Sequence, residues 1–185
     1  GRVLFRSAVE HRHSNLIPAR QFLRACREAR RRSKVADSSG MDLTGGELLT
    51  ATLAFRRVLL RGHLQPDEKM VGLLLPPSAG GAIVNAALTI SGKVAVNLNY
   101  VLSEEVLNFC IKEAGIKRII TSRKVLEKRP MNLDAEFLLV EDLKEQITSA
   151  DKLLSANSAY AEPVGSLERR LGLTKIDPED RKSAG

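Results

Sequence analysis

A short proline- and glycine-rich segment is the first place in this sequence that could bind a ligand. Pro76-Pro-Ser-Ala-Gly-Gly81 follows an apolar run and precedes a helical pattern. Free N–H groups at a helix N-terminus bind phosphate groups. The segment lacks the GxGxxG spacing, however, and no Lys or Arg stands near it to neutralise a phosphate. A structural turn is therefore the favoured interpretation, and nucleotide binding is the alternative.

A second candidate for phosphate binding is Gly92-Lys93, which is similar to the end of a Walker loop. That loop needs a glycine five residues before its second Gly and a Ser or Thr after its Lys. Ala87 and Val94 occupy those positions here. The spacing therefore does not support a nucleotide site at this point.

A polar run, Asn97, Asn99 and Tyr100, follows a second apolar segment. Open α/β sheets bind ligands beyond the carboxyl ends of their strands. Asparagine side chains also satisfy the backbone of turns in such places. Ligand contact and turn formation both stay open for these three residues.

The histidines and acidic residues form no catalytic constellation. His11 and His13 could touch a metal, but no further Cys, His or close carboxylate supports one, so a basic chain end is favoured. His63 is followed at the fifth position by Glu68 and not by the Asp of the His-x4-Asp acyltransferase signature. Asp67 and Glu68 are interpreted as connector residues before a strand. No Gly-x-Ser-x-Gly elbow is present, and we assign no catalytic, cofactor-binding or metal-binding residue.

The positive charge of the chain is concentrated at its start. The 185 residues carry a net charge of +7. Residues 1–34 contain ten Lys or Arg against Glu10 and Glu28, a net charge of +8, and the other 151 residues have a net charge of −1. Such a segment could contact an anionic membrane surface, although a solvated helix face is the favoured interpretation. Nucleic acid is not expected as a partner, because the basic charge is local and lacks interleaved aromatic residues.

The cysteine and hydropathy patterns favour a cytoplasmic protein. The alternative is a cytoplasmic protein that associates with a membrane through the basic segment. Cys26 and Cys110 have no CxxC spacing and are expected to be reduced thiols. No run of about 18 apolar residues is present to span a bilayer, and the first residues lack the apolar core of a signal peptide. The chain also starts without Met, and we expect it to be a piece of a longer protein.

The elements that must position these residues alternate between strands and helices. The length suits one domain with a buried core. Apolar runs predict strands, and helical periodicity with capping residues predicts helices. The predicted helices cover 15–32, 45–61, 79–91 and 104–114, with a short one after Ser122; a hairpin covers 34–44, and strands cover 70–75, 94–98, 118–121 and 137–140. This order predicts an α/β fold with a doubly wound, mostly parallel sheet.

Three segments follow from this pattern. Residues 1–34 are a basic helical segment, 35–150 are an α/β subdomain, and 151–185 are a loop and truncated tail. Within the last segment, 155–165 is rich in Ser, Ala, Asn and Pro and is predicted to be a loop.

Several of these motifs together resemble the first third of the adenylate-forming acyl-activating enzymes, the AMP-dependent synthetases and ligases. The resemblance covers residues 30–155. It is carried by Asp42-Leu-Thr44 with Glu47-Leu48, by Val71-Gly-Leu-Leu74, by Ser91-Gly92 and by Val94-Ala-Val-Asn-Leu-Asn99. Most members have Pro where Asn97 stands. The sequence with Asn in place of Pro is most similar to the acyl–acyl-carrier-protein synthetase half of bacterial bifunctional lysophospholipid acyltransferases. The same similarity is carried by Ile119–Arg123, Glu141–Lys144 and Thr148–Lys152.

The resemblance implies the N-terminal subdomain of that fold and an ATP-dependent long-chain fatty acid ligase. In such an enzyme the carboxylate attacks the α-phosphate of ATP, which gives an acyl-adenylate and pyrophosphate. A thiol of acyl carrier protein or coenzyme A then takes the acyl group, and magnesium assists. The family's Ser/Thr/Gly-rich phosphate loop ending in Pro-Lys is not in this chain.

We therefore carry over no catalytic residue, and we expect an inactive N-terminal fragment to which neither ATP nor magnesium binds. The alternative is a non-catalytic, membrane-peripheral binding module that uses the basic N-terminal helix.

Overall fold

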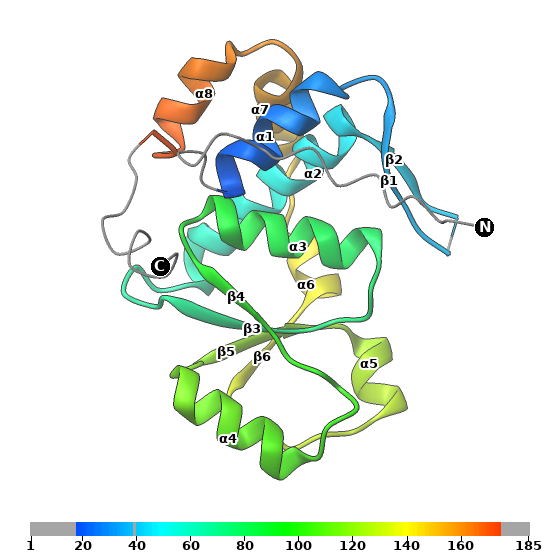
Figure 1. Ribbon diagram of the computed structural model, residues 1–185, viewed down its shortest axis with the longest axis vertical. Helices are drawn as coiled ribbons and strands as arrows, with labels where there is room; N and C mark the ends of the chain where they lie inside the picture. Colours follow the sequence, from blue (N-terminus) through cyan, green and yellow to red (C-terminus); the bar gives the residue numbers. More distant parts are fainter. Residues whose placement is uncertain (1–17, 39, 175–185) are drawn as a thin grey trace, which may run out of the picture.

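The computed structural model describes residues 18–38 and 40–174. Figure 1 shows a central sheet with helices on both faces and a further group of helices beyond one of those faces. The helices are α1 (Pro18–Glu28), α2 (Gly45–Val58) continuing into the π-turn η1 (Leu59–His63), α3 (Ala79–Ile90), α4 (Glu104–Ala114), α5 (Arg123–Lys128), α6 (Val140–Glu145), α7 (Ser149–Tyr160) and α8 (Val164–Arg170). The strands are β1 (Ser33–Ala36), β2 (Asp42–Thr44), β3 (Met70–Leu74), β4 (Val94–Asn97), β5 (Arg118–Thr121) and β6 (Glu136–Leu139).

The main sheet is parallel and has the strand order β4-β3-β5-β6. The predicted fold class is thereby confirmed. The apolar run that forms β3 pairs on both sides, with β4 through Val71 and Ala95 and with β5 through Leu73 and Ile120. Strands that are covered on both faces are expected to be continuously apolar. The predicted hairpin is also present, as the antiparallel pair of β1 and β2.

Each face of the main sheet packs on its own set of helices. On one face, Val71, Leu73 and Ile120 belong to a buried cluster with residues of α2, α3 and α6. On the other face, Leu74 and Ile119 belong to a cluster with Leu107 and Ile111 of α4 and with the partly buried Val125 of α5. The alternation of side chains along each strand produces this division.

A second helical layer lies on the far side of α2 from the sheet (Figure 1). Leu23 and Cys26 of α1 form a buried cluster with Leu49 of α2 and Leu167 of α8. The apolar stripe of the basic helix is therefore part of the core, as its helical spacing predicts.

The predicted helix starts are confirmed by their caps. The Glu47 N–H donates to Thr44 Oγ1 at 3.3 Å, and Thr44 N–H donates to Glu47 Oε2 at 2.8 Å, which completes a capping box. Ser78 and Ser103 cap α3 and α4 through their side-chain oxygens, which accept from the Gly81 and Val106 N–H groups. Gly115 ends α4 with a φ of 62°, in the left-handed region that glycine favours.

The prediction of a loop over residues 155–165 is wrong. Residues 149–160 form α7, and α8 begins at Val164. The helix forms because Thr148 and Asp151 make a second capping box and because α7 packs along α2. The segment division at residues 34 and 150 stays a prediction, and the polar tail from residue 175 onward lies outside the described residues.

Candidate functional site

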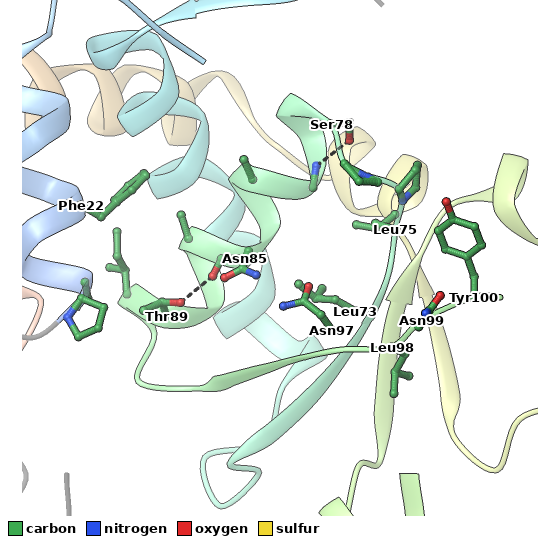
Figure 2. Close-up of a pocket in the computed structure, with 18 residues that line it drawn as sticks. Phe22, Leu73, Leu75, Ser78, Asn85, Thr89, Asn97, Leu98, Asn99 and Tyr100 are labelled. Carbon is green, nitrogen blue, oxygen red and sulfur yellow. Dashed lines mark hydrogen bonds between the residues drawn. The ribbon is translucent and has the colours of Figure 1, made fainter. Parts of the chain in front are cut away.

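A cavity of about 820 Å³ lies at the carboxyl ends of β3 and β4. Its floor is formed by Leu73 of β3 and by Asn97 of β4, one side by α3, and a further wall by Phe22 of α1 (Figure 2). The cavity lies on the α3 side of the sheet and not between β3 and β5, where the strand order reverses. Open α/β sheets bind ligands beyond this edge of the sheet.

The cavity is mostly apolar, and two amide side chains supply its polarity. Asn85 of α3 and Asn97 point toward one another across it (Figure 2). Neither side chain makes a hydrogen bond within the described part of the chain, whereas Thr89 Oγ1 donates to the Asn85 carbonyl at 2.9 Å. None of the lining residues is charged. The cavity therefore suits an uncharged or apolar group that can hydrogen-bond to an amide.

The structure brings the predicted polar run into this cavity, because Asn97, Asn99 and Tyr100 all line it. Their roles differ. Asn99 Oδ1 accepts from the Val101 N–H at 3.0 Å, so this side chain stabilises the turn. Asn97 has its side chain on the cavity and is the residue of the run best placed for a ligand.

The glycine-rich segment also reaches the cavity, through Ser78 and Gly81. Ser78 Oγ accepts from the Gly81 N–H at 3.0 Å, and Asp37 Oδ2 accepts from the Ala79 N–H at 2.9 Å. A carboxylate of the β1–β2 connection therefore already neutralises the N-terminus of α3. A phosphate group would meet a like charge there, so the geometry disfavours nucleotide binding at this helix.

Lys93 of the Walker-like dipeptide is used in a structural contact. Its Nζ donates to the carbonyl oxygens of Gln65, Pro66 and Glu68 at 2.7, 3.1 and 2.6 Å. Three backbone acceptors account for the three donors of an ammonium group. This lysine holds the connection before β3 and has no N–H group left for a phosphate.

Asp67 and Glu68 have separate partners at the amino edge of the sheet. Glu68 is 3% exposed, and its Oε2 lies 2.6 Å from Arg118 Nη1. Arg118 Nε lies 3.0 Å from Glu136, so this arginine joins the starts of β3, β5 and β6. Asp67 is exposed and lies 3.6 Å from Lys117. The two carboxylates do not converge on a common point.

The predicted histidine and cysteine positions do not form a site with these residues. His63 Nε2 shares a hydrogen bond of 2.7 Å with Gln146 Oε1, and His11 and His13 lie outside the described residues. Both cysteines are free. Burial raises the pKa of the Cys26 thiol to about 11, which makes it a poor nucleophile at neutral pH.

The basic helix α1 uses its arginines within the chain. Arg20 and Arg24 lie 3.0 and 2.6 Å from the buried carboxylate of Glu168 in α8. Arg27 Nη1 donates to the Ala159 carbonyl at the end of α7, at 2.6 Å. These three guanidinium groups already have partners within the chain. Binding of the basic segment to an anionic membrane stays a prediction. In the described ranges no helix is long and apolar enough to cross a membrane.

The residues that line this cavity do not fit ATP or magnesium. The cavity supplies no cationic side chain, and the N-terminus of α3 faces a carboxylate. Within residues 18–38 and 40–174, no three His, Cys, Asp or Glu side chains gather where a metal ion could bind. Arg56, Lys69 and Lys93 line an adjoining cavity of about 770 Å³, but Lys93 is occupied by backbone acceptors, and we derive no chemical step through ATP or magnesium.

One wall of the cavity was not predicted from the sequence. Pro18, Ala19 and Phe22 of α1 line it, although they are far in sequence from the strand ends. The only available signal was the apolar stripe of the predicted helix, which does not say which elements it contacts.

A protein-family model described as AMP-binding enzyme matches residues 22–181. Among solved structures, the N-terminal subdomain of Klebsiella oxytoca NpsA in complex with 3-hydroxybenzoyl-AMSN is similar, with a TM-score of 0.64 and 18% identity over 76% of this chain and 35% of that one. VinN in complex with 3-methylaspartate gives a TM-score of 0.60 and 20% identity over 87% of this chain and 41% of that one.

A carrier-protein fusion is also among the similar structures. It is NpsA-ThdA, an artificially fused adenylation–PCP di-domain NRPS from Klebsiella oxytoca, with a TM-score of 0.60 and 20% identity over 72% of this chain and 24% of that one. At these identities the likeness establishes the fold. The chain spans less than half the length of each of these three structures.

Proposed function

The chain belongs to the AMP-binding enzyme family, and from this we propose that it forms the N-terminal part of a longer ATP-dependent fatty acid ligase. The observation that carries the proposal is the family match over 22–181, which spans both helical layers and the whole parallel sheet. In the proposed reaction, a fatty acid carboxylate attacks the α-phosphate of ATP. The products are an acyl-adenylate and pyrophosphate.

The acyl-adenylate makes the second half of the reaction favourable. Displacing hydroxide from a carboxylate is difficult, whereas AMP is a good leaving group. We propose that the thiol of an acyl carrier protein, or of coenzyme A, takes the acyl group and releases AMP. A carrier protein is supported by the adenylation–PCP fusion among the similar structures.

The role we propose for this chain is that of a scaffold. Its described residues place no cation at the cavity, so the groups that neutralise the phosphates of ATP and hold magnesium would come from elsewhere in the longer protein. The uncharged cavity with Asn85 and Asn97 favours a substrate with an apolar body over a charged amino acid. By this argument the cavity suits a fatty acid better than 3-methylaspartate, the amino acid in the VinN complex.

The experiment is ATP–pyrophosphate exchange with the product of the intact gene. The carboxylates tested are a long-chain fatty acid, 3-hydroxybenzoate and a set of amino acids, each with and without magnesium. We expect exchange with the fatty acid, and none when this 185-residue chain is tested alone. Exchange with an amino acid or 3-hydroxybenzoate only would overturn the fatty acid assignment. Absence of exchange with every carboxylate would overturn the ligase assignment.

A further inference from the structure

Four arginines gather where α2 meets α7 and α8, and three of them have carboxylate partners. Arg57 of α2 and Arg61 of η1 lie 2.8 and 2.7 Å from Asp151. Arg170 of α8 lies 2.7 Å from Glu162. The fourth is Arg56, and two carboxylates therefore face four guanidinium groups.

Arg56 makes no ion pair or hydrogen bond within the described residues, and its Nε is buried without a partner. Its pKa is lowered from the usual arginine value by desolvation, and further by Arg170 and Arg57. A guanidinium removed from water is stable only when it is paired with an anion or hydrogen-bonded. Arg56 is partly buried and also lines a second cavity of about 770 Å³, so the unmet group is Nε, which requires an acceptor or an anion beside it.

Ser155 of α7 is a second unsatisfied donor in the same place. It is 2% exposed, and its Oγ is buried with no hydrogen-bond partner in the described part of the chain. Arg56 and Ser155 both line a cavity of about 20 Å³, together with Arg57, Ser158 and Arg170. A cavity of this size holds one water molecule or one monatomic ion.

We propose that this cavity binds a single halide ion, chloride under cellular conditions, between Arg56 Nε and the Ser155 hydroxyl. Both groups donate hydrogen bonds, and the nearby arginines add positive potential. The Glu162 carboxylate opposes an anion, but Arg170 engages it through Nε at 3.2 Å and Nη2 at 2.7 Å. The volume excludes phosphate, sulfate and carboxylates. The proposal does not rest on the proposed ligase function, because the small cavity is formed by residues of α2, α7 and α8 and shares no lining residue with the candidate cavity.

The first experiment is thermal unfolding of the chain in sodium bromide, sodium chloride and sodium gluconate at equal ionic strength. Binding to the folded state raises the unfolding midpoint, and we expect a shift of about 3 °C in the halides over gluconate near ten times the dissociation constant. Arg56→Met and Ser155→Ala should each reduce this shift by more than half. Arg123→Met, a control at an exposed arginine of α5, should keep it. A halide shift of equal size in Arg56→Met would overturn the proposal, because it would reflect general salt effects.

The second experiment needs no variant. Crystals grown in sodium bromide are measured at the bromine absorption edge. An anomalous peak within hydrogen-bond distance of Arg56 Nε and Ser155 Oγ supports the proposal. Ordinary density without an anomalous signal at that point identifies a water molecule and overturns it.

Discussion

Asp151 is a buried carboxylate with partners in three parts of the chain. It is 1% exposed and accepts from Arg57 Nε at 2.8 Å, from Arg61 Nη2 at 2.7 Å and from the Thr148 N–H at 3.1 Å. Hydrogen bonds from Arg61 and Arg57 hold the pKa of this carboxyl well below its usual range. One side chain thus both caps α7 and fastens it to α2.

We expect Asp151→Asn to lower the free energy of unfolding at pH 7 by about 2 kcal/mol, because an amide cannot replace charge-assisted hydrogen bonds. The loss stays below that of a fully buried pair, since both arginines are partly exposed. The measurement is urea denaturation followed by circular dichroism.

Asp142→Asn is the matched control for this change. Asp142 pairs with Arg123 on the surface, and both side chains are about half exposed. Exposed ion pairs contribute about 0.2–1 kcal/mol. Equal losses in the two variants would contradict the structural role given to Asp151.

At the scale of elements, the start of α2 and the end of α1 meet at Gly45. A Cβ atom there would lie 2.3 Å from the Cys26 carbonyl oxygen and 2.8 Å from that of Ala29. The Gly45 N–H also donates to the Ala29 carbonyl at 3.0 Å. The close approach of two backbones therefore requires glycine at this position.

Gly45→Ala should lower the free energy of unfolding by about 2 kcal/mol or more, because the clashing atoms are backbone and cannot rotate away. Gly165→Ala in α8 is the control. The nearest atom to its added Cβ is Arg169 Nη1 at 3.8 Å, and alanine favours the helix by up to about 1 kcal/mol. Urea denaturation of both variants tests the pair, and a neutral Gly45→Ala would refute the close packing.

The elements differ in how far the sequence alone could predict them. Helix α4 and strand β5 were predicted to the residue, because Ser103, Gly115 and a short apolar run mark them locally. Helix α7 was missed because Ser and Asn are weak helix formers. Thr148 and Asp151 carried the local signal of a capping box, but the arginines that complete the helix are about 90 positions away in sequence.

The candidate cavity was also predictable only in part, because some of its residues have a local sequence signal and others are placed by long-range packing. Its strand-end residues Asn97, Asn99 and Tyr100 could be identified, since parallel strands place such residues at one edge of the sheet. The wall formed by Phe22 depends on how α1 packs against α3, which no local pattern encodes.

At the scale of the whole molecule, buried carboxylates join the C-terminal helices to the rest of the fold. Asp151 ties α7 to α2, and Glu168 ties α8 to Arg20 and Arg24 of α1. Two of the arginines of α1 therefore stabilise the fold by pairing with a buried carboxylate. Each of these contacts depends on an ionised carboxylate. Among the described residues, the helical layer has two such buried carboxylates and the sheet has one, Glu68 with Arg118, so the helical layer should be more sensitive to acid than the sheet.

The direction of this pH dependence follows from the depressed pKa values. Asp151 and Glu168 have folded-state pKa values below their ordinary values of 3.8 and 4.5. Their stabilisation is fully present above those values and is lost as the pH falls toward the folded-state pKa. We expect the free energy of unfolding to change little from pH 7 to about 5.5 and to fall by about 2 kcal/mol by pH 3.

Urea denaturation across this range measures the total change, and hydrogen exchange locates it. Amides of α7 and α8 should lose protection at pH 4 before those of β3 and β5, once rates are corrected for intrinsic exchange. Glu168→Gln combined with Asp151→Asn should flatten the acid dependence, whereas Asp142→Asn should leave it unchanged. A double variant that loses stability with acid as steeply as the parent would show that other groups, and not these two carboxylates, control the acid sensitivity.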